Sequence, residues 1–479
     1  MQLDVRLLLP EIALASFAIL VILLDLVITQ KRPLILLSIL GILVSANFTL
    51  QLTGEDNGGT SFFGMLVVDD FAVVFKFIFL LSTLLVTLAS VQYTRRFPTL
   101  QGEYYALLLL ACAGMMLMAS SGDFVLLYLS LELTGISLAV LAGFLKDGRS
   151  GEAGMKFLLL GAISSAVLLY GMTVFLGLTG TTNIRQMAPL LVQGFQVNRL
   201  PIMLGIVLLM AGFGFKMATV PFQMWVPDVY QGAPTPVTAF LSVASKAAGF
   251  AVVLRVFHSA LGQEPLTVDW ATAFAVLSAL TMTLGNVVAI QQQDIKRMMG
   301  YSSIAQAGYL LVGVAVVPQI GTSGVLFFLV SYTVTNLGAF IAIIALSERL
   351  NSDLIADYAG AWQRSPFLAM ALGICLLSLT GVPPTAGFFA KLFIFNAGVQ
   401  QGLLWLVFIG VVNSVVSAYY YIGVIKAMFL GVARVEEPIP APAPLALALV
   451  IATAGTLLLG IFPGPAMDVA AAAASSLVP

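Results

Sequence analysis

Long runs of apolar residues alternate with short polar segments along the whole chain. A helix that crosses the hydrocarbon core of a bilayer needs about 20 mostly apolar residues, because each residue adds only about 1.5 Å. The runs predict helices at approximately residues 7–28, 33–52, 70–92, 104–120, 122–144, 153–178, 201–226, 234–256, 270–290, 297–317, 322–346, 366–397, 402–430 and 443–463. The pattern therefore predicts an all-α polytopic membrane protein with about 14 transmembrane helices.

The composition leads to the same fold class. Of the 479 residues, 60% are hydrophobic and only 9% are charged, whereas about a quarter of a soluble domain is charged. The longest loops, near residues 53–69, 179–200 and 347–365, are too short for a soluble domain. We therefore expect residues 1–479 to form one membrane domain in contact with the lipid bilayer. The net charge of −1 provides no basic surface for nucleic acid.

Basic residues divide the loops into two classes. One set of alternate loops holds Lys31, Arg32, Arg95, Arg96, Lys146, Arg149, Lys156, Lys296, Arg297, Arg349, Arg364, Lys426 and Arg434. The other set holds only Arg6, Arg185 and Arg199. Because cytoplasmic loops carry the excess of lysine and arginine, we expect the first set of loops in the cytoplasm. An even number of spans then places both termini outside.

Two stretches of the chain have the same order of features. In each of them the fourth of five helices is interrupted by proline, at Pro221 in the first and at Pro383 and Pro384 in the second. The predicted organisation is helices 1–3 in residues 1–100, a first repeat of helices 4–8 in residues 101–260, a second repeat of helices 9–13 in residues 265–432, and helix 14 in residues 440–465.

The second helix of each repeat supports this division. It begins at an aspartate, Asp123 or Asp294, and nine residues later stand Glu132 and Ser303. Because each repeat has five spans, the second repeat must be inverted in the membrane relative to the first. Inverted repeats with interrupted helices recur among transporters. We therefore expect two inverted five-helix repeats in which helices 7 and 12 are broken.

Four ionisable residues lie deep inside predicted helices: Glu132, Lys216, Lys246 and Lys391. A charge at the bilayer centre costs at least about 2.5–3.5 kcal/mol on insertion scales, so it is usually kept for function. Desolvation disfavours the charged form of a buried lysine, and a nearby carboxylate favours it. A lysine balanced between these effects can load and release a proton. The pattern favours a proton relay, and the alternative is a set of structural ion pairs between helices.

The prolines stand beside two of these lysines. Pro221 follows Lys216 by five residues, and Pro383 and Pro384 precede Lys391. Each proline removes a backbone hydrogen bond and frees a carbonyl, which is tolerated at membrane depth only inside protein or next to water. We expect non-helical breaks that line a hydrated cavity beside each lysine. The alternative is a kink that only improves helix packing.

Four other charged residues lie near the ends of predicted spans: Lys76, Arg255, Asp25 and Asp123. Long basic side chains at such positions often reach toward the membrane surface or pair with an acid. We therefore assign all four to structure and not to the relay.

Nothing in the sequence indicates redox or metal chemistry. Cys112 and Cys375 lie in different helices, where small apolar core residues are the expected interpretation. The single histidine, His258, lies near a helix end. The sequence has no Cys/His cluster, no glycine-rich nucleotide loop and no haem motif. We expect no catalytic residue, cofactor site or metal site in this chain, so any electron carriers would belong to other chains.

Three motifs resemble the antiporter-like subunits of respiratory complex I, namely KMATVPFQMWVPDVYQGAPTPVTAFLSVASKAAGF, QQDIKRMMGYSSIAQAGYLLVG and LSLTGVPPTAGFFAKLFIF. These subunits are related to those of multi-subunit Na⁺/H⁺ (Mrp-type) antiporters, and the resemblance runs from helix 1 to helix 14. The lysine in GFFAKLF is typical of the subunit N branch, since subunit M has glutamate at the matching position. The chain departs from many relatives at Met224, where they have a histidine that can relay a proton.

The resemblance implies that Glu132, Lys216, Lys246 and Lys391 form the proton path of a proton-translocating subunit, which is not catalytic alone. Quinone reduction in neighbouring subunits would drive it. The resemblance places FMN, iron–sulfur clusters and quinone in partner subunits. It also implies K-, M-, L-, J- and A-like membrane-arm subunits as partners. The expected location is the bacterial plasma membrane, or the thylakoid membrane for a cyanobacterial source.

Two other functions compete with this interpretation. The chain could belong to a stand-alone multi-subunit Na⁺/H⁺ antiporter, in which case it would not purify with flavin and iron–sulfur subunits. It could also be a structural spacer without transport of its own. The four central ionisable residues argue against a spacer, because lipid-embedded charges are costly.

Overall fold

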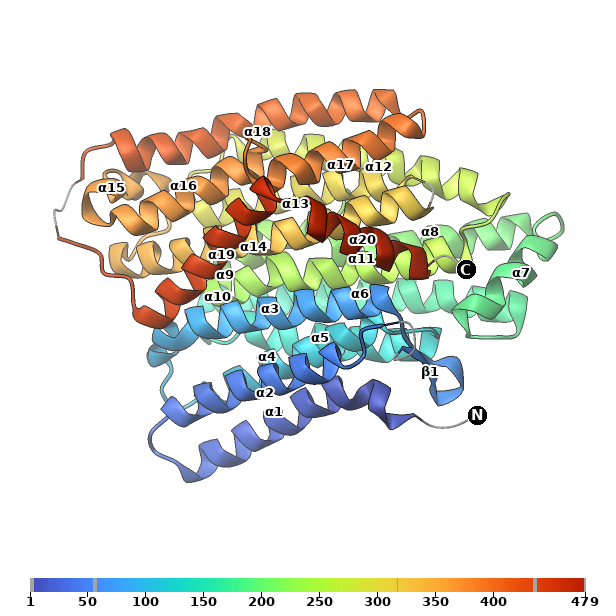
Figure 1. Cartoon of the computed structure of the whole chain (residues 1–479), viewed down its shortest axis with the longest axis horizontal. Coiled ribbons are helices and arrows are strands. Elements are labelled where there is room, and N and C mark those ends of the chain that lie inside the picture. The colour runs from blue at the N-terminus through green and yellow to red at the C-terminus, as the bar shows by residue number, and fades with distance from the viewer. Residues whose placement is uncertain (1–3, 55–57, 317, 434–436, 478–479) are drawn as a thin grey trace.

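The computed structural model describes residues 4–54, 58–316, 318–433 and 437–477. Helices run roughly along the longest axis of the molecule, and short loops connect them at both ends of the bundle (Figure 1). The N- and C-terminal ends of the chain lie at the same end of the bundle, as an even number of spans requires. We call this the terminal end and the opposite one the basic end.

The first three spans are α1 (Leu9–Val27), α2 (Arg32–Leu50) and α3 (Asp70–Tyr93). Strands β1 (Gly59–Ser61) and β2 (Leu66–Val68) form an antiparallel hairpin between α2 and α3. Asp69 caps α3 by accepting a hydrogen bond from the backbone N–H of Ala72. Short 3-10 turns complete this region and the later loops: η1 (Val5–Leu8), η2 (Phe62–Gly64), η3 (Thr94–Arg96) and η6 (Ile355–Tyr358).

Spans four to eight follow the predicted order. They are α4 (Gln101–Ala119), α5 (Phe124–Ala142), α6 (Gly148–Thr179), the pair α8 (Arg199–Met217) and α9 (Trp225–Gly232), and a composite of α10 (Thr235–Phe240), α11 (Lys246–Leu254) and the π-helical turns η4 (Leu241–Ser245) and η5 (Arg255–Ala260). A further helix, α7 (Ile184–Gly194), lies in the loop between α6 and α8.

Spans nine to fourteen complete the bundle. They are α12 (Leu266–Ala289), α13 (Ile295–Val314), α14 (Pro318–Leu350), the pair α16 (Pro366–Thr380) and α17 (Ala386–Gln400), α18 (Leu404–Leu430), and α19 (Ala443–Ile461) followed by α20 (Gly464–Leu477). The four-residue helix α15 (Ala361–Arg364) lies in the loop before α16.

Among the described residues, 12 single helices are long and apolar enough to cross a membrane alone, and the structure has helices at the positions of all fourteen predicted spans. The two further spans are α13 and the broken pair α16–α17. α13 carries polar residues such as Lys296, Ser302, Ser303 and Gln306, which lower its hydropathy, but all four are buried in the protein. The interruptions predicted at Pro221 and at Pro383–Pro384 are also confirmed, since no helix covers either segment.

The predicted last span at 443–463 matches α19, and a further helix, α20, follows it. α19 crosses the bundle obliquely from the basic end, and α20 continues to the terminal end (Figure 1). Ser476 of α20 accepts a hydrogen bond from the backbone N–H of Phe71, and Ser259 donates one to Leu477. The alanine-rich sequence of α20 is too weakly apolar to indicate a membrane span, so the sequence pattern did not predict this additional helix.

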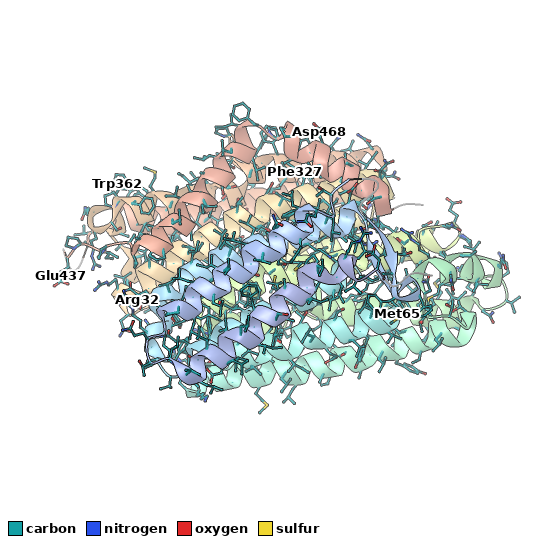
Figure 2. The ribbon with its side chains drawn as sticks, turned by 60° about the horizontal axis from the view of Figure 1, so that its bottom comes forward. Arg32, Met65, Phe327, Trp362, Glu437 and Asp468 are labelled. Carbon is teal, nitrogen blue, oxygen red and sulfur yellow. The ribbon has the colours of Figure 1, made fainter. Side chains whose placement is uncertain are left out.

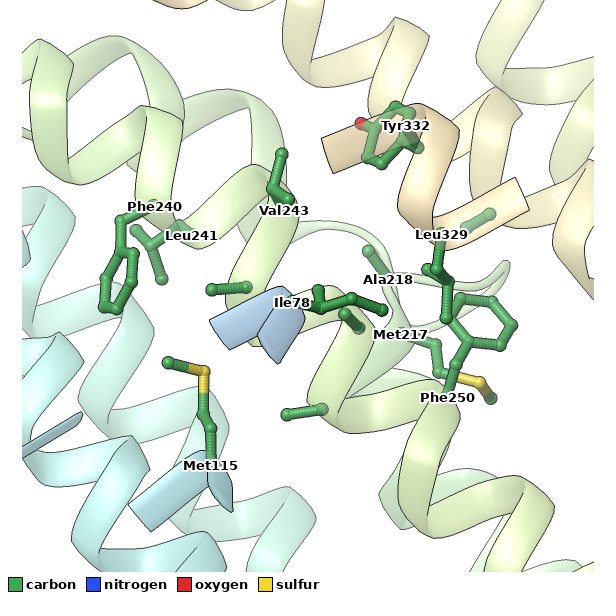
Figure 3. Packing of buried hydrophobic residues seen from close by; sticks show 14 of the residues in the cluster. Ile78, Met115, Met217, Ala218, Phe240, Leu241, Val243, Phe250, Leu329 and Tyr332 are labelled. Atoms are coloured by element: carbon green, nitrogen blue, oxygen red, sulfur yellow. The ribbon is translucent and has the colours of Figure 1, made fainter. Parts of the chain in front are cut away.

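The centre of the bundle is formed by span eight and α14. The most apolar part of Thr235–Ala260 is completely buried, and α14 is nearly so. Figure 3 shows part of the buried cluster to which Val243 of η4 belongs together with Ile78 of α3, Met115 of α4 and Leu329 of α14. A charged residue in span eight is therefore surrounded by protein and has no direct contact with lipid.

The sides of the bundle are apolar and its ends are polar. Leu129 and Ile136 of α5 are exposed on one side, as membrane contact requires. In Figure 2 Arg32 and Glu437 lie at the basic end and Met65 lies toward the opposite end. Of the thirteen residues predicted at the basic end, Arg434 lies outside the described residues.

Candidate functional site

Glu132 and Lys216 face the same small cavity. Glu132 lies in the middle of α5 and is half-buried, whereas Lys216 lies buried in the last turn of α8. Both line a cavity of about 60 Å³, which is large enough for water. Among the described residues they form no ion pair within 4.0 Å, and Glu132 instead accepts a hydrogen bond from Ser165. The two charges are thus brought together across a space that water can fill.

The break after α8 leaves backbone groups without their helical hydrogen-bond partners, and a side chain supplies one of the missing contacts. Ala218 ends α8 in the left-handed region, with φ of 64°. The indole N–H of Trp225, at the start of α9, donates to the carbonyl oxygen of Phe215 at 3.1 Å. Met224 is 70% exposed, so this side chain, at the place where many relatives have histidine, lies at the outer surface of the chain.

Span eight lies directly against Lys216. A Cβ atom added to Gly249 would lie 3.3 Å from the Cγ atoms of Lys216 and Met217, which is closer than about nine in ten real Cβ contacts. Only a glycine fits here without displacing a neighbour. Because Gly249 is about one helical turn from Lys246, the two lysines occupy adjoining parts of the bundle.

Lys246 donates hydrogen bonds to a single residue of α13. Its ammonium group contacts the carbonyl oxygen of Ser303 and, at 2.6 Å, the hydroxyl oxygen of the same residue. The hydroxyl groups of Tyr230 and Tyr332 also lie 3.3 and 3.2 Å from the Ser303 hydroxyl. Ser303 therefore joins Lys246 to two tyrosines, a cluster that the sequence alone did not reveal.

Lys391 uses the carbonyl that the second break sets free. α16 ends at Thr380, and Gly381 has φ of 96°, a conformation that favours glycine. The Lys391 ammonium donates to the carbonyl oxygen of Thr380 at 2.9 Å. It also lies 4.5 Å from the centre of the Tyr309 ring, a favourable cation–π distance. The predicted association of a broken helix with a lysine is therefore present at this site.

Two of the residues assigned to structure form buried ion pairs. Lys76, which is completely buried, lies 2.8 Å from Glu11 of α1. Arg255 donates to Asp69 at 2.8 Å and to the carbonyl oxygen of Ala119 at 2.7 Å. Pairing is therefore confirmed for both basic residues, and neither reaches toward the membrane surface. The sequence pattern had not identified Glu11 as a partner.

The two aspartates also have structural contacts. Asp25 accepts a hydrogen bond from Lys31 at 2.7 Å, next to the basic end. Asp123 caps α5 through the backbone N–H of Val125 and accepts from the hydroxyl of Thr182. Both aspartates therefore have contacts of the kind that a structural role requires.

A polar cavity of about 850 Å³ opens at the basic end, lined by charged residues that include Arg96, Asp294 and Arg297. Arg297 donates to Asp228 at 2.8 Å and to Gln231 at 3.0 Å, and Lys156 donates to Asp228 at 2.7 Å. Asp228 and Gln231 belong to α9, so these contacts hold the second half of the broken helix against α6 and α13. Sequence reasoning missed this network, whose members are far apart in the chain.

The histidine and the two cysteines lie outside the predicted proton path, and each is buried. One ring nitrogen of His258 lies 3.2 Å from the carbonyl oxygen of Val314, and the other lies 2.8 Å from the Thr322 hydroxyl. Because a carbonyl can only accept, the neutral histidine fits both partners. Cys112 and Cys375 are buried free thiols. Within the described ranges, no three His, Cys, Asp or Glu side chains gather as a metal site.

Comparison with known proteins identifies close relatives. Residues 121–417 match the family model described as NADH:quinone oxidoreductase/Mrp antiporter, TM. NADH-quinone oxidoreductase subunit N of Heliobacterium modesticaldum is 46% identical over 442 residues, which cover 92% of this chain and 91% of that protein.

Two solved structures have the same fold. A chain of respiratory complex I from Thermus thermophilus with bound aureothin is 32% identical, with a TM-score of 0.82 and coverage of 96% of this chain and 98% of that chain. A chain of the Mrp complex from Dietzia sp. DQ12-45-1b also has a TM-score of 0.82, with coverage of 99% and 97%, but is only 20% identical. The second likeness shows the fold alone.

Proposed function

We propose a proton path through this chain on the premise that it belongs to the NADH:quinone oxidoreductase/Mrp antiporter family of transmembrane subunits, in the subunit N branch. It is a proton-translocating membrane-arm subunit of NADH:quinone oxidoreductase and is not catalytic alone. Relatives of 46% identity favour this role over that of an Mrp antiporter subunit, to which the likeness is one of fold.

The proposed path passes from Glu132 and Lys216 to Lys246 and then to Lys391. The observation that carries it is that all three lysines are buried and each lies beside a polar group or cavity inside the bundle. Protons would enter through the polar cavity at the basic end and leave from Lys391 toward the terminal end. A spacer has no need to bury three lysines without three matching carboxylates.

The charge of Glu132 controls how readily Lys216 binds a proton in this proposal. A carboxylate near a buried lysine favours its charged form, and removal of that carboxylate favours release of the proton. Water in the cavity between Glu132 and Lys216 allows their separation to change without breaking a tight ion pair. A change in this separation, caused by quinone reduction in a neighbouring subunit, would alter proton loading at Lys216 and then at Lys246.

The inverted repeat is part of the proposal. Asp123 and Asp294 both cap the second helix of their units, and both pair through a backbone bridge with a later loop. The two helices start at opposite ends of the bundle, as inversion requires. Glu132 then corresponds to Ser303, which supports the view that each repeat places a polar residue of its second helix beside a lysine.

Orientation and partners complete the proposal. The basic end faces the cytoplasm, both termini face outside, and the membrane is the bacterial plasma membrane or a cyanobacterial thylakoid membrane. The chain works with other subunits of the complex, and we assign K-, M-, L-, J- and A-like membrane-arm subunits to its surroundings. FMN, iron–sulfur clusters and quinone are assigned to partner subunits.

The variant Glu132→Gln tests the proposal. It keeps the shape of the side chain but removes the negative charge that faces Lys216, so loading of that lysine is disfavoured. We expect proton pumping in assembled complexes to fall by about 10-fold or more. The control is Glu103→Gln, which changes an exposed glutamate in the first turn of α4 and should leave pumping unchanged. Full pumping by Glu132→Gln would refute the role of this pair.

A further inference from the structure

Tyr332 lies between two parts of the proposed path: the cluster formed by Lys246 and Ser303, and the cavity beside Lys391. It is a buried residue of α14, the helix that packs against both span eight and α17. Its hydroxyl group donates to the Ser303 hydroxyl oxygen at 3.2 Å, and that oxygen also accepts from Lys246 at 2.6 Å. Only Ser303 thus separates the hydroxyl group of Tyr332 from the ammonium group of Lys246.

The same tyrosine lines a second cavity together with Lys391. This cavity has a volume of about 10 Å³, close to the smallest volume that can admit one water molecule. Gln306 and Ser331 also line it.

Ser331 gives an independent indication that this cavity holds water. Its side chain is 1% exposed, and its hydroxyl oxygen has no hydrogen-bond partner among the described residues. A buried hydroxyl left without a partner costs about 1–3 kcal/mol. A water molecule in the cavity can satisfy Ser331 and also reach Tyr332 and Lys391, since buried waters bind two to four polar groups.

We propose that the Tyr332 hydroxyl, together with a water molecule held at Ser331, carries protons from Lys246 to Lys391. This inference rests on the proton path proposed above and names the groups that connect its last two lysines. The Ser303 hydroxyl is the first member of the connection, and the cavity water is the last. Sequence patterns did not identify either Tyr332 or Ser331.

The transfer conserves protons at every step. The Lys246 ammonium loses a proton to the Ser303 oxygen, while Ser303 passes its own proton to the Tyr332 oxygen. Tyr332 releases its former hydroxyl proton to the water, which in turn protonates the neutral amine of Lys391. One proton has then moved from Lys246 to Lys391, and the three intervening oxygens each hold as many protons as before.

The direction of one hydroxyl bond controls this connection. In the structure Tyr332 donates to Ser303, whose oxygen also accepts from Lys246. Outward transfer requires the Tyr332 O–H bond to turn toward the cavity so that Ser303 can donate to Tyr332. The transfer itself leaves the new Tyr332 O–H bond pointing at Ser303 again, so the turn toward the cavity must be repeated before each transfer, and the connection is interrupted until it occurs.

The test is Tyr332→Phe, which removes the hydroxyl and keeps the ring. Its control is Tyr104→Phe, because Tyr104 is also buried and its hydroxyl bonds to Ser90, away from the lysines. Proton pumping and quinone reduction are measured in H₂O and D₂O at equal complex content. We expect Tyr332→Phe to pump about 10-fold more slowly and to show a larger solvent isotope effect than the parent. Tyr104→Phe should match the parent in both measurements.

Two further variants make every outcome decisive. Ser331→Ala should give a smaller loss of pumping with the same increase in isotope effect, and it decides the matter if Tyr332→Phe fails to assemble. If Lys246→Met stops pumping but Tyr332→Phe and Ser331→Ala behave like the parent, the connection through Tyr332 is wrong and the proposed path stands. If Lys246→Met also pumps normally, the proposed path itself is wrong.

Discussion

Replacing Lys246 with methionine is expected to reduce proton pumping by about 100-fold or more, as loss of an essential proton-transfer group commonly does. Methionine has a similar length but cannot bind a proton. The ammonium group that contacts Ser303 is lost, and with it the step between Lys216 and Lys391. Because the residue lies at the centre of the bundle, lipid and bulk water cannot replace it. Pumping into sealed vesicles measures the effect, with quinone reduction recorded in the same sample.

The control for this variant is Lys426→Met. Lys426 is an exposed lysine of α18 next to the basic end, so its replacement removes the same charge outside the proposed path. We expect normal pumping from Lys426→Met at equal complex content. Parental pumping by an assembled Lys246→Met complex would remove the central residue from the path.

Replacing Gly387 with alanine is expected to prevent α17 from packing on α16. A Cβ atom at this position would lie 1.8 Å from the carbonyl oxygen of Ser378, far inside contact distance. The two halves of the broken helix must then separate, at a cost of about 3 kcal/mol or more. Both the amount of assembled complex and the thermal midpoint of this subunit should fall.

The matched control is Gly423→Ala in α18. A Cβ atom added there meets no heavy atom within 4 Å, so assembly and thermal midpoint should be unchanged. If Gly387→Ala assembles with the parental midpoint, the close approach of α17 to α16 does not determine the geometry around Lys391.

The sequence predicted most of the fold because the bilayer imposes a simple length requirement on apolar segments. Each of the fourteen predicted spans overlaps a helix or a broken pair of helices, and the prolines at 221, 383 and 384 lie in segments that are not helical. The buried lysines could be identified for a related reason, since a charge within a long apolar run has few structural explanations. Helix α20 was missed because its alanines are neither clearly apolar nor clearly polar.

The contacts of the site could not be predicted from local pattern. Whether Lys246 meets Ser303 depends on how span eight and α13 are rotated about their axes, and the sequence period leaves this rotation open. The pairing of Lys76 with Glu11 joins helices 1 and 3 for a similar reason. Serines, threonines and tyrosines inside apolar helices are also common, so Tyr332 does not differ from a core tyrosine until its neighbours are known.

The central claim is that the buried lysines bind and release protons and are not fixed charges. The most direct test is Lys391→Arg, because arginine keeps the positive charge but does not release its proton in proteins. Protons pumped per quinone reduced are measured at equal complex content for the parent, Lys391→Arg and Lys391→Glu. We predict that Lys391→Arg pumps poorly and that Lys391→Glu, whose carboxylate can be titrated, retains more activity. Parental pumping by Lys391→Arg would contradict the account, because a fixed charge would then be sufficient.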